Sequence, residues 1–246
     1  MQLKTPYKVF TGVLSSIKCK EILEIGNEQF KKETLKATTA LGSNKKHRSS
    51  EITWLNNDKI YDLLFPYVAE ANKSCGWLFQ WDRAELIQFT RYDGKKKQHY
   101  DWHTDGPSDW AGIYKPAFEV SKGSFKPLLM KNNNPILDKN KNFQPDVSKK
   151  DLEKFDNGFL KDNFTVDKEK WGMVRKISMT VSLTDGNDYE GGNFHINYGD
   201  KDIKINDVRE QGSIVVFPSF LRHKVEPVTK GTRYSLVMWA LGKPFQ

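Results

Sequence analysis

Residues 91–105 read RYDGKKKQHYDWHTD, and this stretch decides how the rest of the chain is interpreted. His103 and Asp105 stand two positions apart in a strand-like segment, so both side chains point the same way. Together they can hold one metal ion from a single edge. A third ligand must come from elsewhere, and His223 near the C-terminus is the candidate. Two histidines and one carboxylate on one face of an ion, with the other face open, are the ligand set of non-haem Fe(II) in oxygen chemistry.

A competing pair, His99 and Asp101, lies in the same stretch with the same strand parity. The alternation of side chains along a strand therefore does not distinguish the two pairs. Their position in the strand does distinguish them, because a ligating carboxylate is best placed at a strand end, where it can turn toward an ion. Asp105 is followed by Gly106, which together with the next proline ends the strand. We therefore favour His103 with Asp105, and we expect His99 to be a neighbouring or surface residue.

The two other histidines are expected to play no part in metal binding. His47 lies in a polar loop spanning residues 37–50, so its side chain is expected to be solvated. His195 follows the pair Gly191-Gly192 in a predicted strand. No carboxylate stands two positions away from His195, which favours a structural role.

Length and charge set limits on the class of protein. The length of 246 residues fits one large domain, or one domain with a substantial insertion. The hydrophobic share of 37% is enough for a core. A net charge of +8 is compatible with a nucleic-acid partner, but the basic residues are spread along the chain without a dense block. We therefore interpret the charge first as a contribution to solubility.

Cysteine usage and the absence of long apolar runs predict a cytoplasmic location. Cys19 and Cys75 are the only cysteines, and neither belongs to a CxxC pair, so a reducing compartment is expected. The first ten residues contain no apolar run of signal-peptide length. No stretch approaches the ~18 apolar residues that a spanning helix needs, so we expect no membrane partner.

Hydrophobic periodicity predicts helices first and strands later. Residues 15–36 show helical spacing that Gly26 interrupts, which predicts one helix with a weak point or two short helices. Residues 56–74 also show helical spacing, with Pro66 as a possible kink. The predicted strands span residues 84–92, 99–104, 176–183, 193–198, 203–208, 212–218, 223–228 and 233–241. About eight short strands, without helices between the later ones, favour a mainly β (α+β) fold with an antiparallel double sheet of jelly-roll type.

A long segment separates the two groups of predicted strands. Residues 106–174 are irregular and polar, yet they contain more aromatic residues than a solvated linker would carry. We predict a single domain in which this segment is an insertion that folds back over the site as a lid. The helical support is then residues 1–76, and the β core is residues 77–105 and 175–242.

Arg233 and Ser235 open the last predicted strand with side chains on one face. A guanidinium and a hydroxyl placed in this way can hold a carboxylate, since the planar fork pairs with both oxygens and the hydroxyl adds one hydrogen bond. Arg233 alone would be interpreted as a surface residue of an edge strand. Beside the predicted metal ligands, the carboxylate-binding interpretation is the better one.

Several short motifs occur in a specific order along the chain. They are Tyr92-x-Gly94, Tyr100-x-x-His103-x-Asp105, Gly191-Gly192, residues 212–218, His223 and Arg233-x-Ser235. This ordered set resembles the Fe(II)/2-oxoglutarate-dependent oxygenases, and within them the prolyl 4-hydroxylase-like branch. The resemblance covers residues 84–105 and 175–242, a little over a third of the chain. Each motif alone is weak, but their order and spacing together are specific.

The resemblance implies a double-stranded β-helix with an iron site. By resemblance, His103, Asp105 and His223 hold Fe(II), and Arg233 with Ser235 binds the 5-carboxylate of 2-oxoglutarate. O2 is the second cosubstrate, and ascorbate is a further candidate cofactor. The family hydroxylates a C–H bond while 2-oxoglutarate becomes succinate and CO2. Branch resemblance favours a prolyl or other amino-acid side chain in a peptide or protein as the substrate.

Two features depart from the family pattern. Tyr92 matches a family tyrosine that contacts the cosubstrate, but the span from Tyr92 to His103 is slightly long, so Tyr92 can be displaced. Residues 106–174 exceed what a minimal member needs, so the resemblance carries no substrate information through them.

Two alternatives stay open. A nucleic-acid dealkylase would suit the charge, but that branch typically carries a second arginine six residues after the first, where this chain has Trp239. A β-barrel binding module that has lost catalysis is the other alternative, and the presence of all three predicted ligands argues against it. The sequence leaves the substrate and the oligomeric state undetermined.

Overall fold

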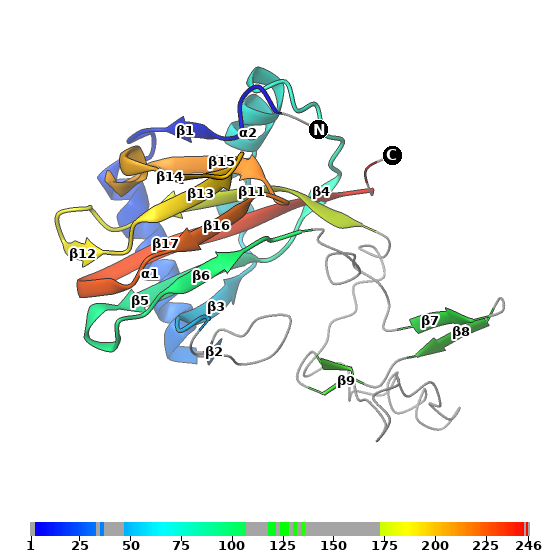
Figure 1. The fold of residues 1–246 in the computed structure, drawn as a ribbon. Helices are drawn as coiled ribbons and strands as arrows, with labels where there is room; N and C mark the ends of the chain where they lie inside the picture. The colour runs from blue at the N-terminus through cyan, green and yellow to red at the C-terminus, as the bar shows by residue number, and fades with distance from the viewer. Residues whose placement is uncertain are drawn as a thin grey trace.

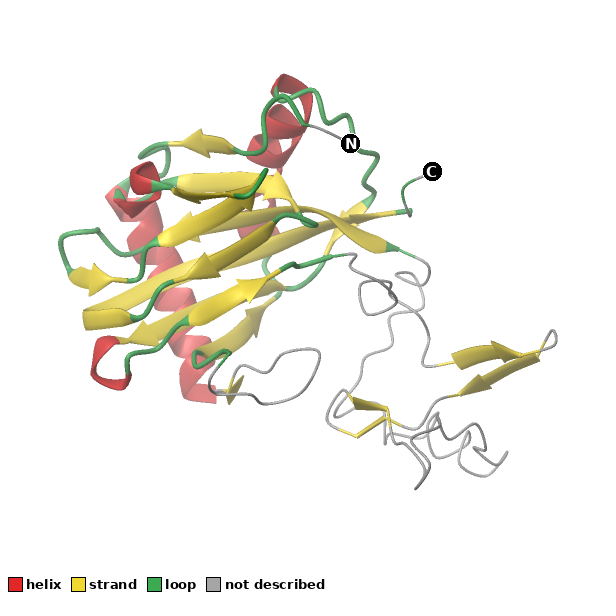
Figure 2. Cartoon of the chain, in the orientation of Figure 1, coloured by secondary structure: helices red, strands yellow, loops and turns green. Residues whose placement is uncertain are grey.

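The computed structural model shows two β-sheets packed face to face, with two helices on the outside of the larger sheet (Figures 1 and 2). It describes residues 3–32, 35–36, 47–106, 118–121, 124–127, 130–131, 134–135, 173–243 and 245. Among the described residues, no helix is long and apolar enough to cross a membrane. The predicted lid, residues 106–174, lies almost wholly outside the described residues.

The larger sheet has nine strands within the described residues. Its main path runs β1 (Lys8–Phe10), β15 (Ile214–Pro218), β11 (Val174–Ser182), β17 (Val228–Gly242), β5 (Ile87–Asp93), β3 (Glu51–Leu55) and β2 (Leu35–Lys36). Two short strands, β4 (Arg83–Ala84) and β12 (Tyr189–Gly191), also pair with β17. All of these pairings are antiparallel.

The smaller sheet carries the metal-binding motif at its edge. Its order is β14 (Lys201–Lys204), β13 (Phe194–Tyr198), β16 (Arg222–Val225) and β6 (Tyr100–His103), again antiparallel. Phe194 of β13 packs against Phe217 of β15 with ring centroids 5.7 Å apart, so apolar side chains fill the space between the sheets. The result is the jelly-roll, or double-stranded β-helix, expected from the strand pattern.

Two helices cover the outer face of the larger sheet. Helix α1 (Ser16–Lys32) contacts β3, and α2 (Asp58–Ser74) contacts β11 and β15. Asn57 begins α2 by accepting a hydrogen bond from the backbone N–H of Ile60 through its side chain. A buried stripe of four residues in each helix faces the sheet, as helical spacing predicts.

Gly26 lies inside one continuous helix, so the alternative of two short helices is wrong. Helix α1 runs through it without interruption. A Cβ atom at Gly26 would lie 2.5 Å from the ring of Phe89 in β5, so the glycine lets the helix approach the sheet closely. The helix also ends at Lys32 instead of residue 36, since residues 35–36 form β2.

The later strands follow the prediction with small corrections. Residues 203–208 do not form one strand, because β14 ends at Lys204 and a 3-10 helix, η5 (Asn206–Arg209), follows. The short strand β12 lies just before the Gly191-Gly192 motif and includes Gly191. A second 3-10 helix, η1 (Gly94–Lys96), directly follows β5. Four short strands lie within the predicted insertion: β7 (Phe118–Ser121), β8 (Ser124–Pro127), β9 (Met130–Lys131) and β10 (Asn134–Pro135).

Candidate metal centre

Three side chains from separate parts of the chain meet between the two sheets. His103 ends β6, His223 lies directly opposite it in β16, and Asp105 follows two residues after His103. His103 Nε2 lies 3.7 Å from Asp105 Oδ1, and His223 Nε2 lies 3.4 Å from Asp105 Oδ2. One ligand atom from each residue falls within 4.8 Å of the others. The predicted triad therefore has the proximity that one metal ion requires.

Backbone hydrogen bonds fix which ring nitrogen of each histidine is free. His103 Nδ1 lies 2.7 Å from the carbonyl of Asp101, and His223 Nδ1 lies 3.0 Å from the carbonyl of Leu221. A carbonyl oxygen only accepts, so each Nδ1 must carry the proton. Each neutral ring then presents the lone pair of Nε2 to the other ligands. This outer support is typical of metal-binding histidines.

Electrostatics favour an ionised carboxyl at Asp105 and a neutral imidazole at His103. Burial alone would raise the pKa of the Asp105 carboxyl, but electrostatic interactions with His223, His103 and Arg175 outweigh it and lower this pKa to about 2. Burial, and then repulsion from His223, lower the pKa of His103 well below its usual value. An ionised carboxylate beside a neutral imidazole is the form required for ligation.

The competing pair does not join this cluster. Asp101 is exposed, and its side chain caps the backbone N–H of Trp102 at 2.7 Å. His99 is half-buried, with Nδ1 3.2 Å from the carbonyl of Lys97. Of the residues that the structure describes, only the triad of His103 and its partners forms a group able to hold a metal.

The other two histidines also lie apart from the triad. His195 Nδ1 is 2.6 Å from Asp202 Oδ1, and its Nε2 is 3.0 Å from Glu226 Oε1. This fits the structural role expected for His195, with one carboxylate from β14 and the other from Glu226 directly after β16. His47 is half-buried with its ring edge against Tyr100, at 5.8 Å between centroids, so it is not the fully solvated side chain that was predicted.

Arg233 lies on the inner face of β17 and is 1% exposed. Its Nη1 donates to Ser235 Oγ at 3.2 Å, and its guanidinium stands 5.4 Å from the ring centroid of Tyr92. Tyr92 pairs with Arg233 across β5 and β17, so the structure brings all three predicted residues together. Within the described part of the chain, Arg233 has no ion-pair partner. An unpaired buried charge is costly, which points to an anionic ligand.

A second group of contacts was not predicted from sequence. Arg175 forms an ion pair with the buried Glu85, its guanidinium lies 3.9 Å from the Trp239 ring centroid, and its Nη1 donates to the Asp105 carbonyl at 3.4 Å. Trp239 is 5% exposed, and its side chain is among the groups that lower the pKa of the Asp105 carboxyl. Only the fold brings these residues to Asp105, since they come from four separate segments.

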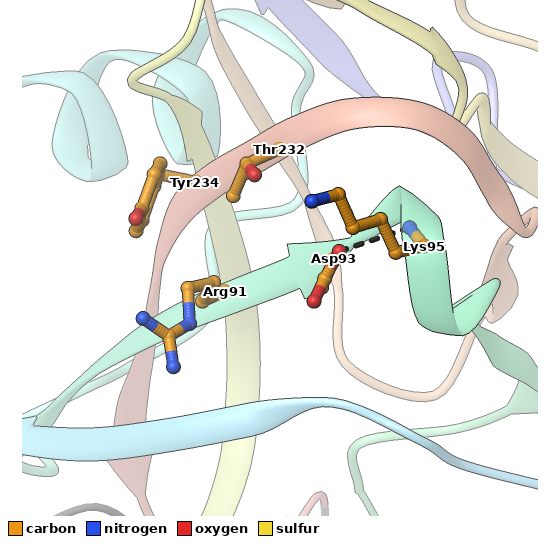
Figure 3. Close-up of a pocket in the computed structure, with 5 residues that line it drawn as sticks. All are labelled: Arg91, Asp93, Lys95, Thr232 and Tyr234. Atoms are coloured by element: carbon orange, nitrogen blue, oxygen red, sulfur yellow. Dashed lines mark hydrogen bonds between the residues drawn. The ribbon is translucent and has the colours of Figure 1, made fainter.

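A shallow surface pocket lies on the other face of β5 and β17. Its volume is about 280 Å³, and Figure 3 shows the residues that line it: Arg91, Asp93, Lys95, Thr232 and Tyr234. Tyr234 stacks on Phe89, which faces helix α1. The pocket is therefore separated from the triad by the sheet itself.

Comparison with known proteins agrees with this geometry. Residues 156–241 match the family model described as the 2OG-Fe(II) oxygenase superfamily. The matched segment is about a third of the chain. The match includes His223 and Arg233 and begins after His103 and Asp105. This similarity agrees with the fold and with the ligand types that the structure gathers.

Curated relatives match over a limited segment. A PKHD-type hydroxylase of Alteromonas mediterranea is 44% identical over 65 residues, which is 26% of this chain and 27% of the relative. A PKHD-type hydroxylase of Shewanella oneidensis is 45% identical over 71 residues, or 28% of this chain and 30% of the relative. The matched segments thus span less than a third of each of these two relatives.

Two solved structures have a similar fold. A prolyl-4-hydroxylase from Pseudomonas putida superimposes with a TM-score of 0.58 at 14% identity, covering 98% of this chain and 95% of that one. A prolyl hydroxylase from Trichoplax adhaerens, in complex with a peptide fragment of hypoxia inducible factor, gives 0.56 at 13% identity over 96% and 84%. At these identities the likeness establishes the fold.

Proposed function

We propose that this protein is an Fe(II)- and 2-oxoglutarate-dependent dioxygenase. One observation carries the proposal: a buried His-Asp-His cluster shares the inside of the jelly roll with a buried arginine that has no ion-pair partner among the described residues. The cluster can ligate a divalent metal ion, and the arginine can bind the carboxylate of an acid. The match of residues 156–241 to the 2OG-Fe(II) oxygenase superfamily supports the same pairing of metal and 2-oxo acid.

The metal in this proposal is Fe(II), held by His103, Asp105 and His223. These residues offer two neutral imidazole nitrogens and one carboxylate, a ligand set that leaves positions for other ligands. When bound, iron supplies the oxidation of a C–H bond by O2, coupled to conversion of 2-oxoglutarate to succinate and CO2. The protein residues keep the ligands oriented and the surroundings largely dry, since the three side chains are at most 9% exposed.

The cosubstrate in this proposal is held by Arg233. Its guanidinium can pair with both oxygens of the distal carboxylate of 2-oxoglutarate, and Ser235 can add a hydrogen bond. The ring of Tyr92 forms one wall of this position. Binding the acid would neutralise a charge that is otherwise buried without a described partner, which gives the interaction its strength.

The substrate we propose is a prolyl or other amino-acid side chain in a peptide or protein. Support comes from the fold shared with prolyl hydroxylases, one of which was solved with a bound peptide. Ascorbate is proposed as an auxiliary reductant by resemblance alone. The net charge of +8 is the observation that favours a nucleic-acid substrate instead. Trp239 occupies the position where that branch would carry a second arginine.

The test measures succinate release with Fe(II), 2-oxoglutarate and O2, with and without candidate substrates. Proline-containing peptides and methylated single-stranded DNA are offered separately, and products are examined by mass spectrometry. We expect peptides to stimulate succinate release and to gain one oxygen atom. Loss of methyl groups from DNA would support the dealkylase instead. Metal binding without any succinate under either condition would favour the binding module and contradict the proposal.

A further inference from the structure

Two buried hydroxyls on neighbouring strands form a chain that ends on Asp105. Ser178 Oγ in β11 lies 2.7 Å from Asp105 Oδ2. Ser219 Oγ, one residue after β15, lies 2.9 Å from Ser178 Oγ. Both serines are 0% exposed. Neither residue was singled out by the sequence or used in the proposed function.

Counting protons gives the direction of each hydrogen bond in this chain. The ionised carboxylate of Asp105 can only accept, so Ser178 must donate its single hydroxyl proton to it. Ser178 then has no proton left for Ser219, so Ser219 must donate to the oxygen of Ser178. Hydrogen bonds ordered in one direction strengthen each other, and the one to the carboxylate is charge-assisted.

The backbone of Ser219 holds the same aspartate from a second direction. Its carbonyl accepts from the backbone N–H of Asp105 at 2.9 Å and from that of Gly106 at 3.0 Å. Its own N–H donates to the carbonyl of Lys176 in β11 at 3.0 Å. The main chain and the side chain of Asp105 are therefore both fixed to the junction of β11 and β15.

We propose that Ser178, supported by Ser219, is a positioning residue that sets the orientation of the Asp105 carboxylate toward the metal. This inference rests on the proposed metal site. The hydroxyl satisfies Oδ2 in a dry interior, where an unmatched carboxylate lone pair is costly. Without the hydroxyl, the carboxylate is free to turn about its side-chain torsion. Such outer contacts commonly change metal affinity roughly 10- to 100-fold.

The experiment compares Co(II) binding to the full-length protein and to two serine variants. Ser182→Ala is the matched control, because Ser182 lies in the same strand, is also 0% exposed, and donates to the Thr184 carbonyl at 3.2 Å instead of to the site. Calorimetry measures affinity, and the visible absorption of bound Co(II) reports its coordination. We expect Ser178→Ala to weaken binding about tenfold or more and to change the absorption at saturating Co(II). Ser182→Ala should keep both wild-type values.

A second variant keeps the inference testable if Ser178→Ala does not fold. Ser219→Ala removes only the donor behind Ser178, so we expect a smaller loss of affinity and a spectral change in the same direction. Wild-type affinity and an unchanged spectrum in the folded serine variants would overturn the positioning role while leaving the metal site intact. Absence of Co(II) binding by the wild-type protein is a different result, and it would overturn the proposed function together with the inference.

Discussion

The left-handed backbone of Gly192 leaves room for the side chain of Arg233. Gly192 has a φ of +62°, and a Cβ atom there would lie 3.2 Å from Arg233 Cδ and 2.8 Å from a methyl group of Val228. The glycine is therefore needed for its lack of a side chain as well as for its backbone conformation. It helps to place the guanidinium beside Tyr92.

We expect Gly192→Ala to weaken 2-oxoglutarate binding while leaving Co(II) binding unchanged. Gly199→Ala is the matched control, because Gly199 has a similar φ of +57° with no atom within 4 Å of its added Cβ. Both variants should lose about 1–2 kcal/mol of stability from the left-handed backbone. Calorimetric titration of the Co(II)-loaded proteins with 2-oxoglutarate should show a lower affinity for Gly192→Ala than for Gly199→Ala. Equal 2-oxoglutarate affinities in the two variants would show that Gly192 does not position Arg233.

Individual side chains differ in how far the sequence could predict them. His103, Asp105 and His223 could be chosen because their types, order and strand-end position are visible in the sequence. Ser178 and Trp239 could not, because they face Asp105 only after β11 pairs with β17 in one register. Their local sequence is that of any buried strand. His47 was misjudged because its polar neighbours in sequence do not reveal its contact with Tyr100.

A charge cluster joins β3, β5 and η1 on the helix side of the larger sheet. Glu51 accepts a hydrogen bond from Arg91 Nε at 2.7 Å and one from Lys96 Nζ at 2.8 Å. Burial tends to raise the pKa of Glu51, but hydrogen bonds from Lys96 and Arg91 outweigh it, and the pKa is lowered from its usual 4.5. The stabilisation is therefore present above pH 4.5 and is lost as the pH falls below it.

We expect Glu51→Gln to lower the free energy of unfolding by about 1 kcal/mol at neutral pH and to have little effect near pH 3. Urea unfolding at a series of pH values measures the difference. Glu190→Gln is the control, because the pair of Glu190 with Lys230 is exposed on both sides. A loss for Glu51→Gln that stayed constant down to pH 3 would assign its effect to packing instead of charge.

Secondary-structure elements were predictable where the periodic hydrophobic pattern extends over many residues. Helix α2 and strands β5, β11, β13 and β15 follow the predicted ranges to within a few residues, whereas α1 ends four residues earlier and β17 begins five residues earlier than predicted. The short strands β1 and β12 were missed, since three residues carry too little periodicity. At Gly26 the sequence left one helix or two short helices open, because helix propensity is local, whereas the contact with Phe89 is tertiary.

The ends of the predicted insertion lie next to each other in the folded core. A Cβ atom at Gly106 would lie 2.9 Å from Cβ of Arg175, although the two residues are far apart in sequence. The chain therefore leaves the core at Gly106 and returns to it at an adjacent position, so the core does not need the intervening residues to bring its two parts together. This supports the proposal that one oxygenase core carries a separate insertion.

We expect replacement of residues 107–172 by a short Gly/Ser linker to leave a folded protein that binds Co(II) like the wild type. The chain ends are already adjacent, so a short loop closes them at small entropic cost. Thermal unfolding and calorimetry measure the two properties. Substrate-stimulated succinate release should be lost if the segment is the lid predicted from the sequence. An unfolded product would show that the segment belongs to the core.

The fold class of the whole molecule could be predicted from the sequence, but the pairing of its strands could not. Alternation of short strands with turn residues was enough for an antiparallel double sheet. The position of β6 at the edge of the smaller sheet, opposite β16, depends on contacts between residues about 120 positions apart. Such long-range pairing is set by the packing of Phe194, Phe217 and His223 between the sheets, which no local pattern records.

The most direct test is anaerobic titration of the protein with Fe(II) and then 2-oxoglutarate, followed by visible absorption. A 2-oxo acid chelating Fe(II) gives a charge-transfer band that neither component shows alone. We expect the band in the wild type and in His99→Ala, and we expect no band in His103→Ala. Absence of the band in the wild type, or its loss in His99→Ala with retention in His103→Ala, would contradict the metal site proposed here.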